Sequence, residues 1–95
     1  MSEYLKDKVI VITGAGSGVG KLVVEKTAAA GAHVVGVDVN ADNVNAVVEG
    51  IRAAGGSALA QVADVTDMEQ VAAAANATVE QFGAIDVLVN NARSE

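Results

Sequence analysis

Short runs of β-branched residues alternate along the chain with segments whose apolar residues recur every three or four positions. Continuous apolar runs of this length predict strands buried in a parallel sheet. The i, i+3, i+4, i+7 spacing between them predicts helices with one apolar stripe. The expected strands are 9–12, 34–37, 59–62 and 85–89, and the expected helices lie near 19–30, 44–51 and 68–82.

The ends of the three predicted helices carry their own signals. Gly31, Gly55 and Gly83 stand where each apolar stripe stops, and glycine is the usual residue for a left-handed helix cap. Thr66 and Glu69 have the spacing of a capping box before the third helix. The pattern therefore predicts where each helix ends and how the third begins.

Strands begin near residues 9, 33, 59 and 85, which gives a repeat of about 25 residues. A leucine-rich solenoid has a similar period, but its LxxLxL signature is missing. Strands that alternate with helices through short connections favour right-handed crossovers and a parallel sheet. We therefore expect an α/β chain with a partial Rossmann (doubly wound) fold: four parallel strands in the order 3-2-1-4, and the third helix on the face opposite the first two.

This strand order places a topological switch point between the first and fourth strands. Ligands bind at such a point, beyond the carboxyl ends of the strands. Candidate chemistry is therefore expected just after residues 12, 37, 63 and 89.

Composition narrows the class of protein. The chain has 95 residues, 52% hydrophobic and 19% charged, so residues 1–95 are expected to form a single folded module. Its net charge of −6 disfavours binding to nucleic acid or to anionic lipid. It has no cysteine, one histidine, no apolar stretch of bilayer length and no secretory signal pattern. We expect a cytoplasmic protein with no metal site, no nucleic acid partner and no membrane partner.

A glycine-rich segment follows the first strand. Four glycines fall within positions 14–20, where a chain that must turn sharply also lets a diphosphate approach backbone amides at a helix N-terminus. The pattern GxGxxG does not fit, because Val19 takes its last place. The pattern GxxxGxG fits through Gly14, Gly18 and Gly20.

Asp38 closes the second strand, at the offset expected for a carboxylate that accepts hydrogen bonds from an adenosine ribose. The same charge repels a 2′-phosphate, so NAD is expected in preference to NADP; Ser17 and Val39 supply no compensating cation, although Lys21 is nearby. The alternative is that Asp38 caps the next helix or is simply solvated.

Two further strands end in polar residues. Asp64 and Val65 follow the third strand, where a carboxylate and an apolar side chain can hold the edge and face of an adenine. Asn90, Asn91 and Ala92 follow the fourth. With Thr13-Gly14, Gly18, Gly20 and Asp38, these residues resemble the N-terminal half of a short-chain dehydrogenase/reductase, of the 3-oxoacyl-ACP-reductase-like kind. The resemblance runs from about Lys6 to Ala92.

The resemblance implies roles for ten residues. It implies that the glycine-rich segment lines the diphosphate, that Asp38 holds the adenosine ribose, that Asp64 and Val65 hold the adenine, and that Asn90 and Ala92 lie beneath the second ribose. Arg93 departs from the family pattern, which has glycine there. The cofactor-binding candidates are Gly14, Ser17, Gly18, Val19, Gly20, Asp38, Asp64, Val65, Asn90 and Ala92.

The resemblance also implies hydride transfer between a nicotinamide and a hydroxyl or carbonyl carbon, carried out by Ser, Tyr and Lys residues beyond the matched segment. The only tyrosine, Tyr4, forms a YxxxK pattern with Lys8, but it precedes the first strand, in an expected extended lead-in at the amino edge of the sheet. His33 opens the second strand at that same edge and is expected to be a partly exposed structural residue. No catalytic residue is expected in this chain.

Three hypotheses follow. The first is a truncated NAD-binding module that is inactive alone. The second is a non-enzymatic Rossmann half that self-associates, as a homodimer or larger assembly, through the edge of the fourth strand or the open sheet face. The third is one piece of an enzyme whose remainder was removed, is disordered or is supplied by another chain.

Overall fold

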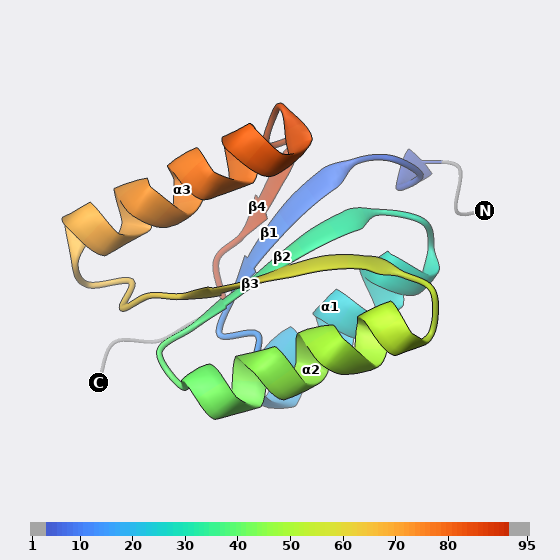
Figure 1. The fold of residues 1–95 in the computed structure, drawn as a ribbon, viewed down its shortest axis with the longest axis horizontal. Helices are drawn as coiled ribbons and strands as arrows, with labels where there is room; N and C mark the ends of the chain where they lie inside the picture. Colours follow the sequence, from blue (N-terminus) through green and yellow to red (C-terminus); the bar gives the residue numbers. More distant parts are fainter. Residues whose placement is uncertain (1–3, 92–95) are drawn as a thin grey trace.

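The computed structural model describes residues 4–91. Strands and helices alternate from one end of this segment to the other (Figure 1). In chain order they are β1 (Val9–Thr13), α1 (Gly18–Ala29), β2 (His33–Asp38), α2 (Ala41–Ala53), β3 (Ser57–Val62), α3 (Met68–Phe82) and β4 (Val87–Val89).

The four strands form one parallel sheet in the order β3-β2-β1-β4. All five residues of β1 are buried, because this strand is hydrogen-bonded on both sides and covered on both faces. Sequence analysis predicted this order, and the structure confirms it. The switch point therefore lies between β1 and β4, at the edge of the sheet where β1 ends at Thr13 and β4 ends at Val89.

Helices cover both faces of the sheet: α1 and α2 lie on one face and α3 on the other (Figure 1). The α1–α2 face holds the larger core, in which Ile12, Val24, Val34 and Val44 have no more than trace exposure. The α3 face holds a smaller cluster of Val11, Val35, Val37 and Ala63, against which Leu59 and Phe82 pack. The sheet is thus packed much more completely on one side than on the other.

The predicted helix ends are partly confirmed. Gly31, Gly55 and Gly83 have φ values of 98°, 91° and 90°, the left-handed geometry that glycine adopts without a Cβ penalty. The predicted capping box is wrong: Asp67 caps α3 by accepting hydrogen bonds from the backbone N–H groups of Glu69 and Gln70 at 3.0 and 3.3 Å. The Thr66 hydroxyl turns the other way and donates to Asp64.

The fourth strand is shorter than the predicted run of 85–89. Asp86 explains the difference, because its carboxylate Oδ2 accepts a hydrogen bond from the Val9 N–H at 2.8 Å. A side chain thus satisfies the Val9 N–H, while the Asp86 N–H still donates to the Val9 carbonyl at 2.9 Å. Regular pairing with β1 begins at Val87.

The amino edge of the sheet is built from structural contacts. The predicted extended lead-in is wrong: the chain turns before β1, with the Lys8 N–H donating to the Leu5 carbonyl at 3.0 Å. His33 is partly exposed as expected; its Nδ1 lies 2.8 Å from Ser57 Oγ and its ring stacks on Phe82. Within residues 4–91, none of the helices has the length and apolar character needed to span a bilayer.

Candidate functional site

Four loops meet at the carboxyl edge of the sheet, because all four strands are parallel and end there. They are the glycine-rich segment after β1, the turn that begins at Asp38 at the end of β2, Asp64 and Val65 after β3, and Asn90 after β4. The fold thus gathers at one edge the candidates that the sequence separates by up to 76 positions.

Glycine is required in the first loop for two different reasons, backbone conformation and lack of space. Gly14 and Gly18 have φ values of 67° and 58°, where a side chain would be strained. Gly20 has no room, since a Cβ there would lie 2.0 Å from the Gly14 carbonyl oxygen. Helix α1 can therefore start directly against the loop only because position 20 has no side chain.

The N-terminus of α1 differs from those of the other two helices. Asn40 and Asp67 cap α2 and α3 through their side-chain oxygens, and each of these helices has an acidic residue in its first turn. At α1 the Ser17 side chain makes no capping hydrogen bond and the first turn has no acidic residue. The backbone N–H groups at the start of α1 and the positive end of its dipole can therefore bind an anion.

Asp38 lies beside this helix end. Its Oδ2 accepts a hydrogen bond from the Gly16 N–H at 2.8 Å, and its Oδ1 accepts one from the Asn40 N–H at 3.0 Å. The carboxylate therefore faces the glycine-rich loop and does not cap α2, which Asn40 caps. This arrangement sets a carboxylate next to a cradle of backbone amides.

Thr13 ties β1 to the loop after β4. Its hydroxyl accepts a hydrogen bond from the Asn91 N–H at 2.9 Å and donates to the side-chain oxygen of Asn90 at 3.3 Å. The Asn91 side-chain amide lies 3.5 Å from the Gly14 carbonyl. These contacts hold the loop after β4 against the end of β1 and the glycine-rich loop, at the switch point.

Asp64 forms a compact turn after β3. Its Oδ1 accepts hydrogen bonds from the Thr66 hydroxyl at 2.7 Å and from the Thr66 N–H at 2.9 Å. These two bonds favour the charged form and lower the pKa of the Asp64 carboxyl from its usual 3.8, and burial opposes the shift. Asp64 is therefore an anionic acceptor at neutral pH, next to a half-buried Val65.

A mostly apolar cavity of about 220 Å³ opens on the α3 side of this edge. Thr13, Val65 and Asn90 contribute to its wall, together with apolar residues of α3, β1, β2 and β4. Apolar walls with a few polar groups are typical of sites for flat organic rings. The cavity connects Val65, one of the two residues predicted to hold the adenine, with Asn90 in the loop after β4.

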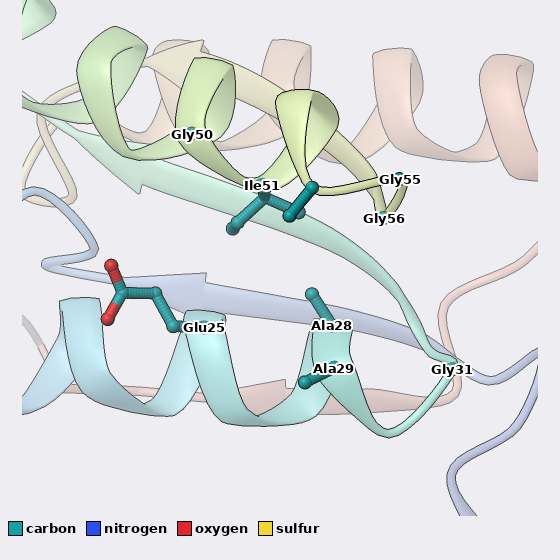
Figure 2. Close-up of a pocket in the computed structure, with 9 residues that line it drawn as sticks. Glu25, Ala28, Ala29, Gly31, Gly50, Ile51, Gly55 and Gly56 are labelled. Atoms are coloured by element: carbon teal, nitrogen blue, oxygen red, sulfur yellow. The ribbon is translucent and has the colours of Figure 1, made fainter.

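A larger, open groove of about 630 Å³ lies elsewhere, between the carboxyl-terminal ends of α1 and α2 (Figure 2). Ala28, Ala29 and Gly55 line it, and Glu25 adds a negatively charged side chain. Carbonyl oxygens gather at the carboxyl ends of helices and repel anions. This groove is far from the glycine-rich loop and does not fit a phosphate ligand.

Most of the residues predicted from the sequence come together at the carboxyl edge. Ser17, Gly18 and Val19 are exposed at the start of α1, and Gly20, in the same turn of the helix, is buried against Gly14 of the preceding loop. Ala92 and Arg93 lie outside the described residues. Sequence reasoning missed Gly16, whose N–H group meets Asp38; the signal was its place between Gly14 and Gly18 in a run of alternating glycines.

Comparison with known proteins gives a consistent result. A family model described as short chain dehydrogenase matches residues 8–94. Over 88 residues the chain is 44% identical to the 7alpha-hydroxysteroid dehydrogenase of Escherichia coli strain K12. That match covers 93% of this chain and 34% of the enzyme, so the chain spans about a third of the length of this relative.

Solved structures agree in fold. A 7 alpha-hydroxysteroid dehydrogenase complexed with NADH and 7-oxo glycochenodeoxycholic acid superimposes with a TM-score of 0.92 and is 43% identical; 95% of this chain and 35% of that one are covered. A short chain dehydrogenase/reductase from Burkholderia phymatum in complex with NAD gives a TM-score of 0.87 at 40% identity, covering 88% and 30%.

Proposed function

The chain belongs to the short chain dehydrogenase family, and from that premise we propose that it is the dinucleotide-binding part of an oxidoreductase that uses NAD(H). The observation that carries the proposal is the Asp38 carboxylate, held 2.8 Å from the Gly16 amide beside a helix N-terminus with no side-chain cap. Amides in this arrangement suit a diphosphate, and a carboxylate at its side suits the neighbouring sugar hydroxyls.

Each candidate then has a part in the proposed complex. The glycine-rich loop and first turn of α1 bind the diphosphate, and Asp38 binds the adenosine ribose. Asp64 and Val65 hold the adenine, and Asn90 and Ala92 lie beneath the second ribose. The diphosphate group consists of Gly14, Ser17, Gly18, Val19 and Gly20.

NAD is the proposed cofactor in preference to NADP. A 2′-phosphate on the ribose would stand next to the Asp38 carboxylate, and like charges at that distance repel each other. Ser17 and Val39 add no positive charge on either side. Two relatives with similar structures were solved with NADH or NAD, which supports this choice.

Isothermal titration calorimetry with NAD and NADP tests the proposal. We expect NAD to bind the chain with a dissociation constant on the order of 0.1–1 mM or weaker, with NADP weaker still. Asp38→Ala should weaken NAD binding by about 1.5–3 kcal/mol, the value of a charge-assisted hydrogen bond. Asp42→Ala, which removes an exposed carboxylate four residues away, is the matched control. Heat from neither nucleotide, or tighter binding of NADP, would contradict the proposal.

Hydride transfer is proposed for the whole protein and not for these 95 residues alone. In the whole enzyme the nicotinamide would exchange hydride with a hydroxyl or carbonyl carbon, and this chain would hold the cofactor in place. Tyr4 is 87% exposed and precedes β1, at the edge of the sheet opposite the nucleotide site. We expect no change in NADH absorbance when the chain is mixed with NAD and a secondary alcohol.

Self-association is a second candidate function, favoured by apolar side chains exposed on α3 and β4. Met68 is 78% exposed, Leu88 is 62% exposed and Val87 is 41% exposed, and among the described strands β4 is paired on one side only. Burying such side chains against a second copy would be favourable. We therefore propose a homodimer or larger assembly through the β4 edge or the open α3 face; a cytoplasmic location remains a prediction.

Sedimentation equilibrium at tens of micromolar tests this second candidate. The chain should sediment above its monomer mass, and Leu88→Lys should shift it toward the monomer. Val62→Lys changes a residue that is 53% exposed at the end of β3, the opposite edge strand, and should leave the mass unchanged. A monomer at every concentration would exclude self-association.

A further inference from the structure

Asp38 contacts two separate parts of the chain at once. One carboxylate oxygen accepts the Gly16 N–H from the loop after β1, and the other accepts the Asn40 N–H at the start of α2. Both donors are backbone amides, so the carboxylate is fixed in orientation and links the two segments. Asp38 itself ends β2 and is half-buried.

Two neighbouring amides of the glycine-rich loop are held in different ways, one by a backbone carbonyl and one by the Asp38 side chain. The Ala15 N–H donates to the Val37 carbonyl at 3.1 Å, so backbone alone holds that amide. The next amide, of the buried residue Gly16, is held by the Asp38 side chain. Without the carboxylate a buried N–H would lose its acceptor, which favours a different path for the loop.

There is no room for a side chain at position 16. A Cβ at this position would lie 2.8 Å from Asp38 Oδ2 and 2.8 Å from the Asn43 Cβ. The backbone therefore runs directly against the carboxylate and against the first turn of α2. Asp38 and the missing side chain at Gly16 together determine how close the loop comes to β2.

We infer that Asp38 is a positioning residue for the glycine-rich loop, so that recognition of the sugar and recognition of the diphosphate are coupled through the Gly16 amide. The coupling rests on the proposed nucleotide-binding function, whereas the loop contact does not. A carboxylate oxygen can accept more than one hydrogen bond. Asp38 can therefore hold the loop and accept a sugar hydroxyl at the same time.

A role confined to the sugar and a role in positioning the loop predict different results. If Asp38 contacts only ribose hydroxyls, its removal weakens ligands that carry them and leaves other ligands unaffected. If Asp38 also positions the loop, its removal weakens a ligand without those hydroxyls, because the amides that face the diphosphate have moved. ADP and 2′,3′-dideoxy-ADP form the matched pair of ligands.

The first measurement needs no nucleotide. Hydrogen exchange of the Gly16 amide, followed by NMR in the whole chain, should accelerate about tenfold or more in Asp38→Ala, since a charge-assisted bond is lost. Asp38→Asn keeps one acceptor oxygen and should give an intermediate rate. Amides of β1 report whether each variant stays folded, and Asp42→Ala is the control of equal charge. Unchanged Gly16 exchange in folded Asp38→Ala would overturn the inference.

The second measurement is calorimetry with the two diphosphates. We expect Asp38→Ala to weaken both ADP and 2′,3′-dideoxy-ADP, the second by at least a few-fold, and Asp42→Ala to change neither. Unchanged affinity for the dideoxy ligand would overturn the coupling. If the unaltered chain bound neither ligand, the proposed function would fail, and Gly16 exchange would still decide whether Asp38 positions the loop.

Discussion

At the scale of single residues, Gly20 shows how little space separates α1 from the loop before it. A Cβ at this position would meet the Gly14 carbonyl oxygen at 2.0 Å and the Asn91 side-chain nitrogen at 2.8 Å. Neither the loop backbone nor the helix can move without disturbing the other. The last glycine of the GxxxGxG pattern is thus a packing requirement, apart from any role in the proposed diphosphate site.

Gly20→Ala is expected to destabilise the chain by about 1–3 kcal/mol or more, because the new methyl group overlaps backbone atoms. Gly50→Ala is the matched control: this glycine lies in α2, and a Cβ added there would have no neighbouring atom within 4 Å. Alanine there should stabilise the chain by about 0.5–1 kcal/mol through helix propensity. Urea unfolding of both variants tests the pair, and equal effects would contradict the steric argument.

Asp64 gives a prediction about pH at the same scale. Hydrogen bonds from Thr66 lower the pKa of its carboxyl from 3.8, so the unfolded chain binds this proton more readily than the folded chain does. The stabilisation is complete above the unfolded pKa and is lost as the pH falls through the lower folded pKa.

Thr66→Val should therefore raise the pKa of the Asp64 carboxyl toward its ordinary value, because the hydroxyl donor is lost and the backbone donor stays. NMR titration of the side-chain carboxyl carbon measures this directly. Thr27→Val, which removes a hydroxyl bonded within α1, is the control. An unchanged Asp64 pKa in Thr66→Val would show that the hydroxyl bond has no influence.

At the scale of elements, sequence periodicity predicted every strand and helix within residues 4–91, and the errors about these elements occurred only at their ends. The hydrophobic period shows which residues face the core, so it predicts the middle of a strand or helix reliably. Ends depend on single side chains, as Asp86 shows by accepting the Val9 N–H with its carboxylate just before β4. Likewise, Thr66 and Glu69 have the spacing of a capping box, but Asp67 is the residue that caps α3.

Asp67→Ala should lower the stability of the chain by about 1 kcal/mol, the usual cost of losing a helix cap. Its side chain accepts hydrogen bonds from two backbone amides of the first turn of α3. Asp67→Asn keeps an acceptor oxygen and should retain most of that stability. Thermal unfolding followed by circular dichroism separates the two variants; equal losses would mean that charge, and not capping, matters at this position.

At the scale of the whole molecule, the two faces of the sheet differ in how completely they are packed. The α1–α2 face contains most of the fully buried side chains, whereas α3 buries only Ala74 and Thr78 and β4 has no buried residue. Local opening requires less energy where fewer apolar contacts must be broken. The α3–β4 side is therefore expected to be the less stable part of the fold.

Hydrogen exchange followed by mass spectrometry tests this difference. Peptides from α3 and β4 should exchange faster than peptides from β1, β2 and α1, because they can open without disrupting the larger core. If the chain self-associates through the α3–β4 side, this difference should shrink as concentration rises. Uniform protection at low concentration would contradict the proposed asymmetry.

The sequence by itself determined the order of elements, the strand order 3-2-1-4 and the edge of the sheet where polar residues gather. The order of elements follows from the hydrophobic period, and the parallel sheet follows from short right-handed crossovers, whereas the order 3-2-1-4 is the arrangement typical of the Rossmann fold. Only the tertiary structure decided that Asp38 holds the Gly16 amide, that Thr13 links β1 to Asn91, and that Asp67 caps α3. Such contacts depend on distances between atoms that are fixed only when the strands lie side by side, and no spacing along the chain reports them.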